Sequence, residues 1–173
     1  INLTNNIDLL VKRFTHFFKT LKIENMGEGI IRKLINANYN TLDSILNASK
    51  EDLLSISGFK ETLAQKIYNN IHNVIDKPIR AELLMVSSLC FGHGFGVRKM
   101  KIITDHYIHS HNIFDLTPIH IYKLDGFEEK TTNKFMEGLP KFKEFMEAHP
   151  YLKITKIRKI VLKKSPKEQG KLN

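Results

Sequence analysis

Apolar residues recur three and four positions apart along most of this 173-residue chain. Residues with that spacing share one face of an α-helix, so the pattern predicts helices with one buried side. Strand-like alternation is rare. The chain is therefore predicted to be all-α and to open with an amphipathic helix over residues 6–22, whose apolar face comprises Ile7, Leu10, Val11, Phe14, Phe17, Phe18 and Leu21.

Capping residues mark the starts of three short helices. Thr41 and Ser49 each precede a short apolar segment, and Thr117 is followed by a proline, which suits the first position of a helix. The segment 112–116 resembles the one that follows Thr41. Longer helices are expected from the first turn to about residue 37, over 61–75, from about 79 to a turn at 92–96, and from there to His106 or beyond.

The last long helix is expected to end at Gly138-Leu139-Pro140. Proline lacks a backbone N–H and its ring clashes with the preceding helical turn, so it breaks helices. A separate terminal helix is therefore predicted over 141–148, and partly extended chain is predicted from Pro150 onward.

Four short turns share one form, in which an apolar residue lies between two positions that are mostly glycine. They are Asn25-Met26-Gly27, Gly58-Phe59-Lys60, Gly94-Phe95-Gly96 and Gly126-Phe127-Glu128, and their last residues are 33, 36 and 32 positions apart. A near-constant period indicates repeated units. We expect four motifs, each made of a helix, a tight turn and a second helix, and we expect them to form two pairs. The middle residue of each turn is expected to point inward. The predicted divisions are a leading helix over 1–22, a first pair over 23–77, a second pair over 78–149 and a basic tail or linker over 150–173.

The formal net charge of +9 is unevenly distributed. Residues 151–173 hold eight basic residues and one acidic residue, whereas residues 1–150 hold nineteen basic and seventeen acidic residues. The near-neutral body argues against a general polyanion-binding surface, so nucleic acid would be bound through local patches. No apolar run is long enough to span a membrane, and no membrane partner is expected. The single cysteine, Cys90, fits an intracellular protein, and the start at Ile1 leads us to interpret the chain as a fragment.

The turns have the chemistry of an anion site. Glycine lets the backbone turn tightly and approach a ligand closely. The next residues begin a helix, whose free N–H groups and dipole favour a negative group such as a phosphate. Because backbone amides carry no base information, such contacts predict binding to the DNA backbone without sequence preference.

All four turns resemble the helix-hairpin-helix motif. Four in a row, with FFKTLKIENMGEGIIRKL and LSISGFKETLAQKI, are similar to the C-terminal helix-hairpin-helix domain of NAD-dependent DNA ligases over roughly residues 10–148. The resemblance implies a module that lies against nicked duplex DNA and helps the enzyme to encircle it. It also implies upstream adenylation and OB domains in the same chain, NAD and Mg²⁺ as cofactors of the parent enzyme, and a BRCT module beyond the Lys-rich end.

The four turns do not match the motif equally. The third is complete, the first has Asn25 in place of glycine, and the second has Lys60. The fourth has Glu128 followed by Glu129, and carboxylates beside a phosphate are unfavourable, so this turn is interpreted as mainly structural. The candidate DNA-contacting residues are Gly94, Gly96, Arg98, Lys99, Lys101, Gly27, Gly29, Arg32, Lys33, Gly58, Lys60, Gly126 and Lys130.

Other signals are weaker. Lys123-Leu124-Asp125-Gly126 matches the Lys-x-Asp-Gly motif whose lysine carries the adenylate in ligases, but we interpret it as the lead-in to the fourth turn because no room remains for a nucleotide-binding domain. His106, His109 and His111 have spacing that could serve a metal, but they lack supporting ligands and are interpreted as loop residues. We therefore predict no catalytic residue, metal or cofactor within this segment.

Two other functions remain open at this stage. The same paired motifs could belong to a structure-selective nuclease or a junction-binding protein. A third possibility is a protein-interaction scaffold that has kept the fold without binding DNA, which the near-neutral body and Glu128 would suit.

Overall fold

The computed structural model describes residues 3–155, and this part of the chain is all-helical, as its sequence pattern predicts. The predicted tail from residue 156 onward lies outside the described residues. The elements are α1 (Leu3–Thr20), α2 (Glu28–Asn36), α3 (Leu42–Leu46), α4 (Lys50–Leu54), α5 (Glu61–Ile75), α6 (Ala81–Ser87), α7 (Val97–Tyr107), the 3₁₀ turn η1 (Ile113–Asp115), α8 (Pro118–Tyr122) and α9 (Glu129–Ala148).

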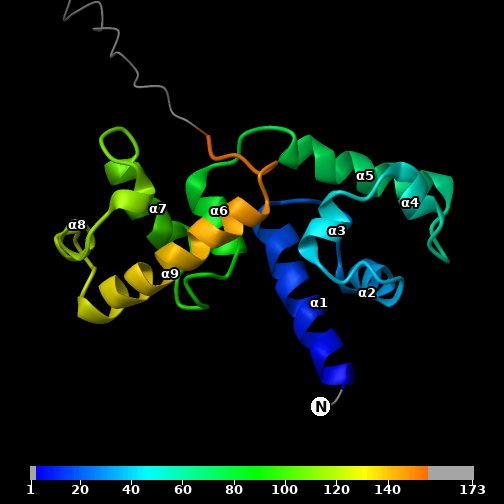
Figure 1. Ribbon diagram of the computed structural model, residues 1–173, viewed down its shortest axis with the longest axis horizontal. Helices are drawn as coiled ribbons and strands as arrows, with labels where there is room; N and C mark the ends of the chain where they lie inside the picture. Colours follow the sequence, from blue (N-terminus) through cyan, green and yellow to red (C-terminus); the bar gives the residue numbers. More distant parts are fainter. Residues whose placement is uncertain (1–2, 156–173) are drawn as a thin grey trace, which may run out of the picture.

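Helix α1 lies between the two halves of the molecule. Figure 1 shows α2–α5 on one side of it and α6–α9 on the other, and α1 packs against both α2 and α6. The His16 ring Nε2 lies 2.9 Å from the Val86 carbonyl oxygen and ties α1 to α6. Phe17 and Phe18 are almost fully buried, so the predicted apolar face of this helix joins the two halves into one core.

The hairpins share the core positions that the repeat predicts. Their middle residues, Met26, Phe59, Phe95 and Phe127, are 3–5% exposed. The positions four and seven residues after each turn are also buried, and they are Ile31, Leu34, Ala64, Ile67, Met100, Ile103, Thr132 and Phe135.

The short helices α3 and α4 have N-terminal caps at the residues that the sequence predicts. The Ser44 N–H donates to Thr41 Oγ1 over 3.1 Å at the start of α3. At the start of α4, the Asp52 N–H donates to Ser49 Oγ over 3.0 Å, and the Ser49 N–H donates to the Asp52 carboxylate over 2.9 Å. These reciprocal bonds are capping boxes, and they satisfy amide donors that a helix start otherwise leaves open.

The prediction of two helices around Pro140 was wrong. Helix α9 is continuous from Glu129 to Ala148 with Pro140 inside it. The helix is held on both sides of the proline, because Phe135 and Phe142 are fully buried and their ring centroids lie 5.3 and 5.9 Å from that of Phe91. Burial of two phenylalanines outweighs the roughly 3 kcal/mol cost of an internal proline.

The predicted helix from about residue 79 begins later, at Ala81. Ile79 instead pairs with the chain after α9 in an isolated parallel bridge to Ile154. The Ile79 N–H donates to the Lys153 carbonyl over 2.7 Å, and the Thr155 N–H donates to the Ile79 carbonyl over 2.8 Å. Leu152 is 2% exposed, so the first residues of the predicted tail are packed into the body.

Candidate nucleic-acid interface

Three of the four turns contain a residue in the left-handed conformation at the predicted position. It is Asn25 (φ 62°) in the first turn, Gly58 (φ 87°) in the second and Gly126 (φ 83°) in the fourth. The third turn differs, because its left-handed glycine is Gly92 (φ 78°) and Gly94 does not have a positive φ. The third turn, which matches the motif best in sequence, therefore has a backbone path of its own.

The helix that follows each turn begins without a side-chain cap. The N-cap residues of α2, α5, α7 and α9 are Gly27, Lys60, Gly96 and Glu128, and none makes a side-chain capping hydrogen bond. All four have the same extended backbone, with φ between −97° and −81°. The N–H groups in the first turns of these helices are thus available to an external acceptor, unlike those of α3 and α4.

Glycine at two of these positions is not required by the protein itself. A Cβ built on Gly27 or Gly96 meets no atom within 4 Å, and the extended backbone suits any residue. The same backbone is compatible with Lys60 in the second turn. The absence of a side chain at Gly27 and Gly96 therefore matters for what approaches from outside.

The predicted contact residues fall into two groups. Most are exposed, namely Gly27, Gly29, Lys33, Gly58, Lys60, Gly94, Gly96, Arg98, Lys101, Gly126 and Lys130. Arg32 and Lys99 are partly covered. Arg32 Nη2 lies 2.8 Å from Asp8 Oδ1, and Lys99 Nζ lies 5.8 and 5.6 Å from the ring centroids of Phe95 and Phe127. Both side chains thus already have partners within the protein, and their contact with DNA stays a prediction.

The fourth turn keeps its negative charge unpaired. Asp125, Glu128 and Glu129 are exposed and form no ion pair among the described residues. The segment from Lys123 to Gly126 forms the turn that leads to α9, as interpreted from its register. The three carboxylates repel a phosphate and therefore disfavour its binding at this turn.

Comparison with known proteins agrees with this geometry. Residues 17–73 match the family model described as a SAM-like helix-hairpin-helix tandem. The match covers the first pair, and the second pair repeats its hairpin–helix plan in the structure. No solved structure matches the chain significantly.

Most of the chain is similar to part of proteins named DNA ligase. The identity is 37% with the DNA ligase of Acanthamoeba polyphaga mimivirus, over 83% of this chain and 23% of that protein. It is 30% with the DNA ligase of Vesicomyosocius okutanii, over 75% of this chain and 20% of that protein. A DNA repair and recombination protein RadA from Metallosphaera sedula is 37% identical over 34% of this chain and 18% of that protein. The chain thus spans about a fifth to a quarter of the length of these ligases.

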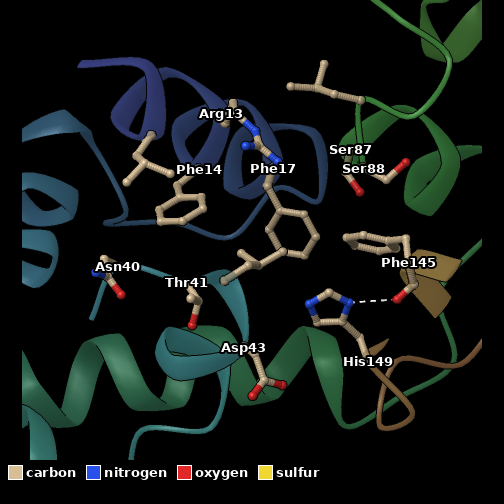
Figure 2. A pocket seen from close by; sticks show the side chains of 13 residues that line it. Arg13, Phe14, Phe17, Asn40, Thr41, Asp43, Ser87, Ser88, Phe145 and His149 are labelled. Carbon is tan, nitrogen blue, oxygen red and sulfur yellow. Dashed lines mark hydrogen bonds between the residues drawn. The ribbon is translucent and has the colours of Figure 1, made fainter. Parts of the chain in front are cut away.

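The protein also has a pocket of about 370 Å³ between α1, the segment before α3 and the end of α9. Figure 2 shows Arg13, Asp43 and His149 around it. His149 Nδ1 lies 2.7 Å from the Phe145 carbonyl oxygen. The hydroxyl groups of Ser87 and Ser88 donate to backbone carbonyl oxygens over 3.0 and 2.7 Å. The serines and the histidine are therefore each engaged with the backbone and are not arranged as a nucleophile and its base.

The histidine-rich segment after α7 packs against α8. The rings of His111 and His120 are 4.8 Å apart, and the Tyr107 hydroxyl donates to the His120 carbonyl. Within residues 3–155 no group of three or more His, Cys, Asp or Glu side chains could hold a metal ion. No helix in the same range is long and apolar enough to cross a membrane.

Lys134 is absent from the residues that the sequence predicts to contact DNA, and it follows the fourth turn in the chain. In the structure a Cβ built on Gly94 would lie 2.6 Å from Lys134 Nζ, so the ammonium group lies at the third turn. The signal that could have located it is its position in the repeat, six residues after the last residue of its turn, which is the position of Lys33 in the first motif.

Proposed function

We propose that this helix-hairpin-helix chain binds duplex DNA through the phosphate backbone, without sequence preference. The observation that carries the proposal is the difference between its helix starts. Connecting helices α3 and α4 cap themselves with Thr41 and Ser49, whereas the four hairpin helices, like α6, make no side-chain cap.

An uncapped helix start is suited to a phosphate for two reasons. Its free N–H groups are hydrogen-bond donors without a partner, and the helix dipole places about half a positive charge there. A phosphate oxygen satisfies both. Since every nucleotide has the same phosphate, the expected binding depends on backbone shape and salt.

We further propose that the chain is the DNA-clamping part of an NAD-dependent ligase that seals nicks during DNA replication and repair. The similarity to a segment of two proteins named DNA ligase supports this parent. Its partners would be nicked duplex DNA and the adenylation and OB domains of the same polypeptide, which would use NAD and Mg²⁺. The protein would then act inside the cell, wherever the DNA is.

A different parent is the second candidate. The similarity of about a third of the chain to a protein named for DNA repair and recombination supports it. In that case the paired hairpins would serve a nuclease or junction-binding protein. Binding to nicked, intact and branched duplexes separates the candidates, because a ligase module should not prefer the branched substrate. A scaffold without DNA affinity is the third candidate, and the exposed carboxylates of the fourth turn are the feature that favours it.

The proposal is tested with a substitution that blocks approach to one helix start. Gly96→Val adds a β-branched side chain where a Cβ meets nothing within 4 Å, so the fold should survive with at most about 1 kcal/mol lost from the helix start. We expect weaker binding of residues 1–173 to a fluorescent duplex. Asn73→Val, which adds the same side chain at an exposed position far along α5, should leave affinity unchanged.

Deletion of the basic tail tests the alternative that the tail, and not the hairpins, binds DNA. Because Leu152 is buried and Thr155 is bonded to Ile79, the deletion should begin at residue 156. If binding survives Gly96→Val and disappears with the deletion, the hairpins are a scaffold and the proposed function is wrong.

A further inference from the structure

The pocket beside α1 is lined by residues from both halves of the molecule. They come from α1, from the segment that leads into α3, from the end of α6 and from the end of α9. The volume of about 370 Å³ lies within the range of roughly 300–1,000 Å³ that small-molecule sites occupy. No residue of the four hairpin turns, all of which are described, lines the pocket. It is therefore separate from the helix starts that would contact phosphate.

One wall of the pocket is aromatic. Phe14 and Phe17 on α1 and Phe145 on α9 line it, and Figure 2 shows their rings in a row. The ring centroids of Phe17 and Phe145 are 6.5 Å apart, and the His149 ring centroid lies 4.4 Å from that of Phe145. Aromatic rings gain most when they pack against the face or edge of another flat ring. The wall therefore suits a planar ligand.

Hydrogen-bonding side chains surround this aromatic wall. In the view of Figure 2, Asn40 and Asp43 lie on one side of the rings and Arg13 lies on the other. The Arg13 guanidinium group forms no ion pair among the described residues. The Asn40 amide can both donate and accept, the guanidinium group donates and the carboxylate accepts. The rim thus offers donors and acceptors on opposite sides of the wall, which suits a ligand with polar edges.

Two of the lining side chains are held in place by bonds within the protein. Asp43 Oδ1 accepts from the Tyr151 hydroxyl over 2.7 Å and from the Asn47 amide over 3.0 Å. His149 Nδ1 lies 2.7 Å from the Phe145 carbonyl oxygen, and because a carbonyl only accepts, Nδ1 carries the hydrogen. Asp43 Oδ2 and His149 Nε2 have no hydrogen-bond partner among the described residues. Fixed polar groups with unused bonding capacity reduce the entropy lost when a ligand binds.

The lining discriminates between classes of ligand. A free phosphate is disfavoured, because it would be held between a carboxylate and an apolar wall. A purely aliphatic ligand would cover Asn40 and Asp43 and leave their polar groups without partners, which costs binding free energy. A nucleobase avoids both penalties, because its faces stack on aromatic rings and its edges carry donors and acceptors. Arginine, asparagine and aspartate are also side chains that bind base edges in protein–DNA complexes.

We infer that this pocket binds a nucleobase ring, stacked on the phenylalanine wall and hydrogen-bonded at its edges by Asn40, Asp43 and Arg13. This ligand chemistry has two sources, a free nucleoside and an unpaired base of a DNA strand. The inference does not depend on the proposed function, because the ring needs no phosphate contact at a hairpin. A ring bound here contacts both halves of the molecule and stabilises the folded chain by mass action.

Adenosine and cytidine test the inference, because neither carries a phosphate that could bind at a hairpin. Each is titrated into the isotope-labelled chain of residues 1–173, and the backbone amide signals are followed by NMR. We expect saturable shifts at Leu42, Ser88 and His149, which lie in the lining, and none at Gly27 and Gly96. Cyclohexanol is the control ligand, since its ring is apolar but has no aromatic face. It should bind at least about tenfold more weakly than adenosine.

Two matched pairs of substitutions locate the site. Phe145→Leu removes a ring of the wall, whereas Phe114→Leu removes a ring that packs on the same Phe142 but lies outside the lining. Phe145→Leu should weaken adenosine binding by about tenfold, and Phe114→Leu should leave it unchanged. Asn40→Ala should weaken it by about fivefold, whereas Asn36→Ala, an exposed change at the end of α2, should have no effect. Urea unfolding confirms that each variant is folded.

A duplex with one unpaired adenine is compared with the fully paired duplex to identify the source of the base. Tighter binding of the unpaired duplex, lost in Phe145→Leu, assigns the pocket to a base of the DNA strand. Equal binding of the two duplexes, with adenosine binding retained, assigns it to a free nucleoside. If neither nucleoside shifts the pocket amides, if cyclohexanol binds as tightly as adenosine, or if Phe145→Leu binds adenosine like the wild type, the inference is wrong. The proposed function stands in each of these cases, because Gly96→Val tests it separately.

Discussion

Gly138 provides a sharp test of the packing that positions α9. A Cβ built at this position would lie 2.8 Å from the Cys90 carbonyl oxygen and 2.9 Å from Phe91 Cγ. A backbone oxygen and a buried ring cannot move aside easily, because Phe91 is 3% exposed and is packed against Phe135 and Phe142. Gly138→Ala should therefore force α9 away from the segment that follows α6.

The magnitude follows from two opposing effects. Overpacking of a core costs about 1–3 kcal/mol, whereas alanine in place of glycine within a helix gains up to about 1 kcal/mol. We expect Gly138→Ala to lower the free energy of unfolding by about 1–2 kcal/mol. Gly29→Ala is the matched control, because Gly29 is also helical and a Cβ there meets no atom within 4 Å. It should raise the free energy of unfolding by about 0.5–1 kcal/mol.

Urea unfolding followed by circular dichroism measures both variants, and their midpoints should move in opposite directions. The same substitution gives opposite signs only if the close approach at Gly138 is real. If Gly138→Ala is as stable as Gly29→Ala, then α9 does not pass this close to Phe91, and the continuous helix through Pro140 would have to be revised. Lys134 lies one turn before Gly138 on this helix, so a displaced α9 should also weaken DNA binding.

Two further predictions concern a buried hydroxyl group and a partly buried thiol. Thr132 is 4% exposed and its hydroxyl has no hydrogen-bond partner among the described residues. Thr132→Val should raise the free energy of unfolding by about 1 kcal/mol, because it removes an unsatisfied group at nearly constant shape. A loss of stability in urea unfolding would show that the hydroxyl is hydrogen-bonded in solution. Burial raises the pKa of the Cys90 thiol above its ordinary value. Since the thiolate is the reactive form, alkylation at pH 8 should be slower in the folded protein than in 8 M urea, and this stabilisation of the protonated thiol should be lost as the pH rises through the raised pKa. Equal alkylation rates in the two states would contradict the burial.

The local features were predictable because they depend on residues close together in the chain. The buried positions of Met26, Phe59, Phe95 and Phe127 follow from the repeat and from helical spacing. The capping boxes at Thr41 and Ser49 involve residues three positions apart. Such interactions are formed within one turn of helix, so a single sequence is enough to recognise them.

The features that sequence reasoning missed all depend on distant residues. Pro140 remains within a helix because Phe135 and Phe142 pack on Phe91, which lies more than forty residues away in the chain. Ile79 leaves the expected helix because the chain after α9 returns to it. In both cases tertiary packing outweighs a local preference.

The sequence by itself determined the class of fold, the four turns and the helix starts that lack a cap. It did so because helix periodicity, turn glycines and missing capping side chains are local properties of the chain. Only the tertiary structure decided which lysine lies at which turn. Lys33 and Lys134 reach Gly58 and Gly94 because the fold brings the sixth position after one turn beside the turn of the other hairpin. Electrostatic complementarity to a phosphate is a property of that arrangement in space, and the order of residues along the chain does not contain it.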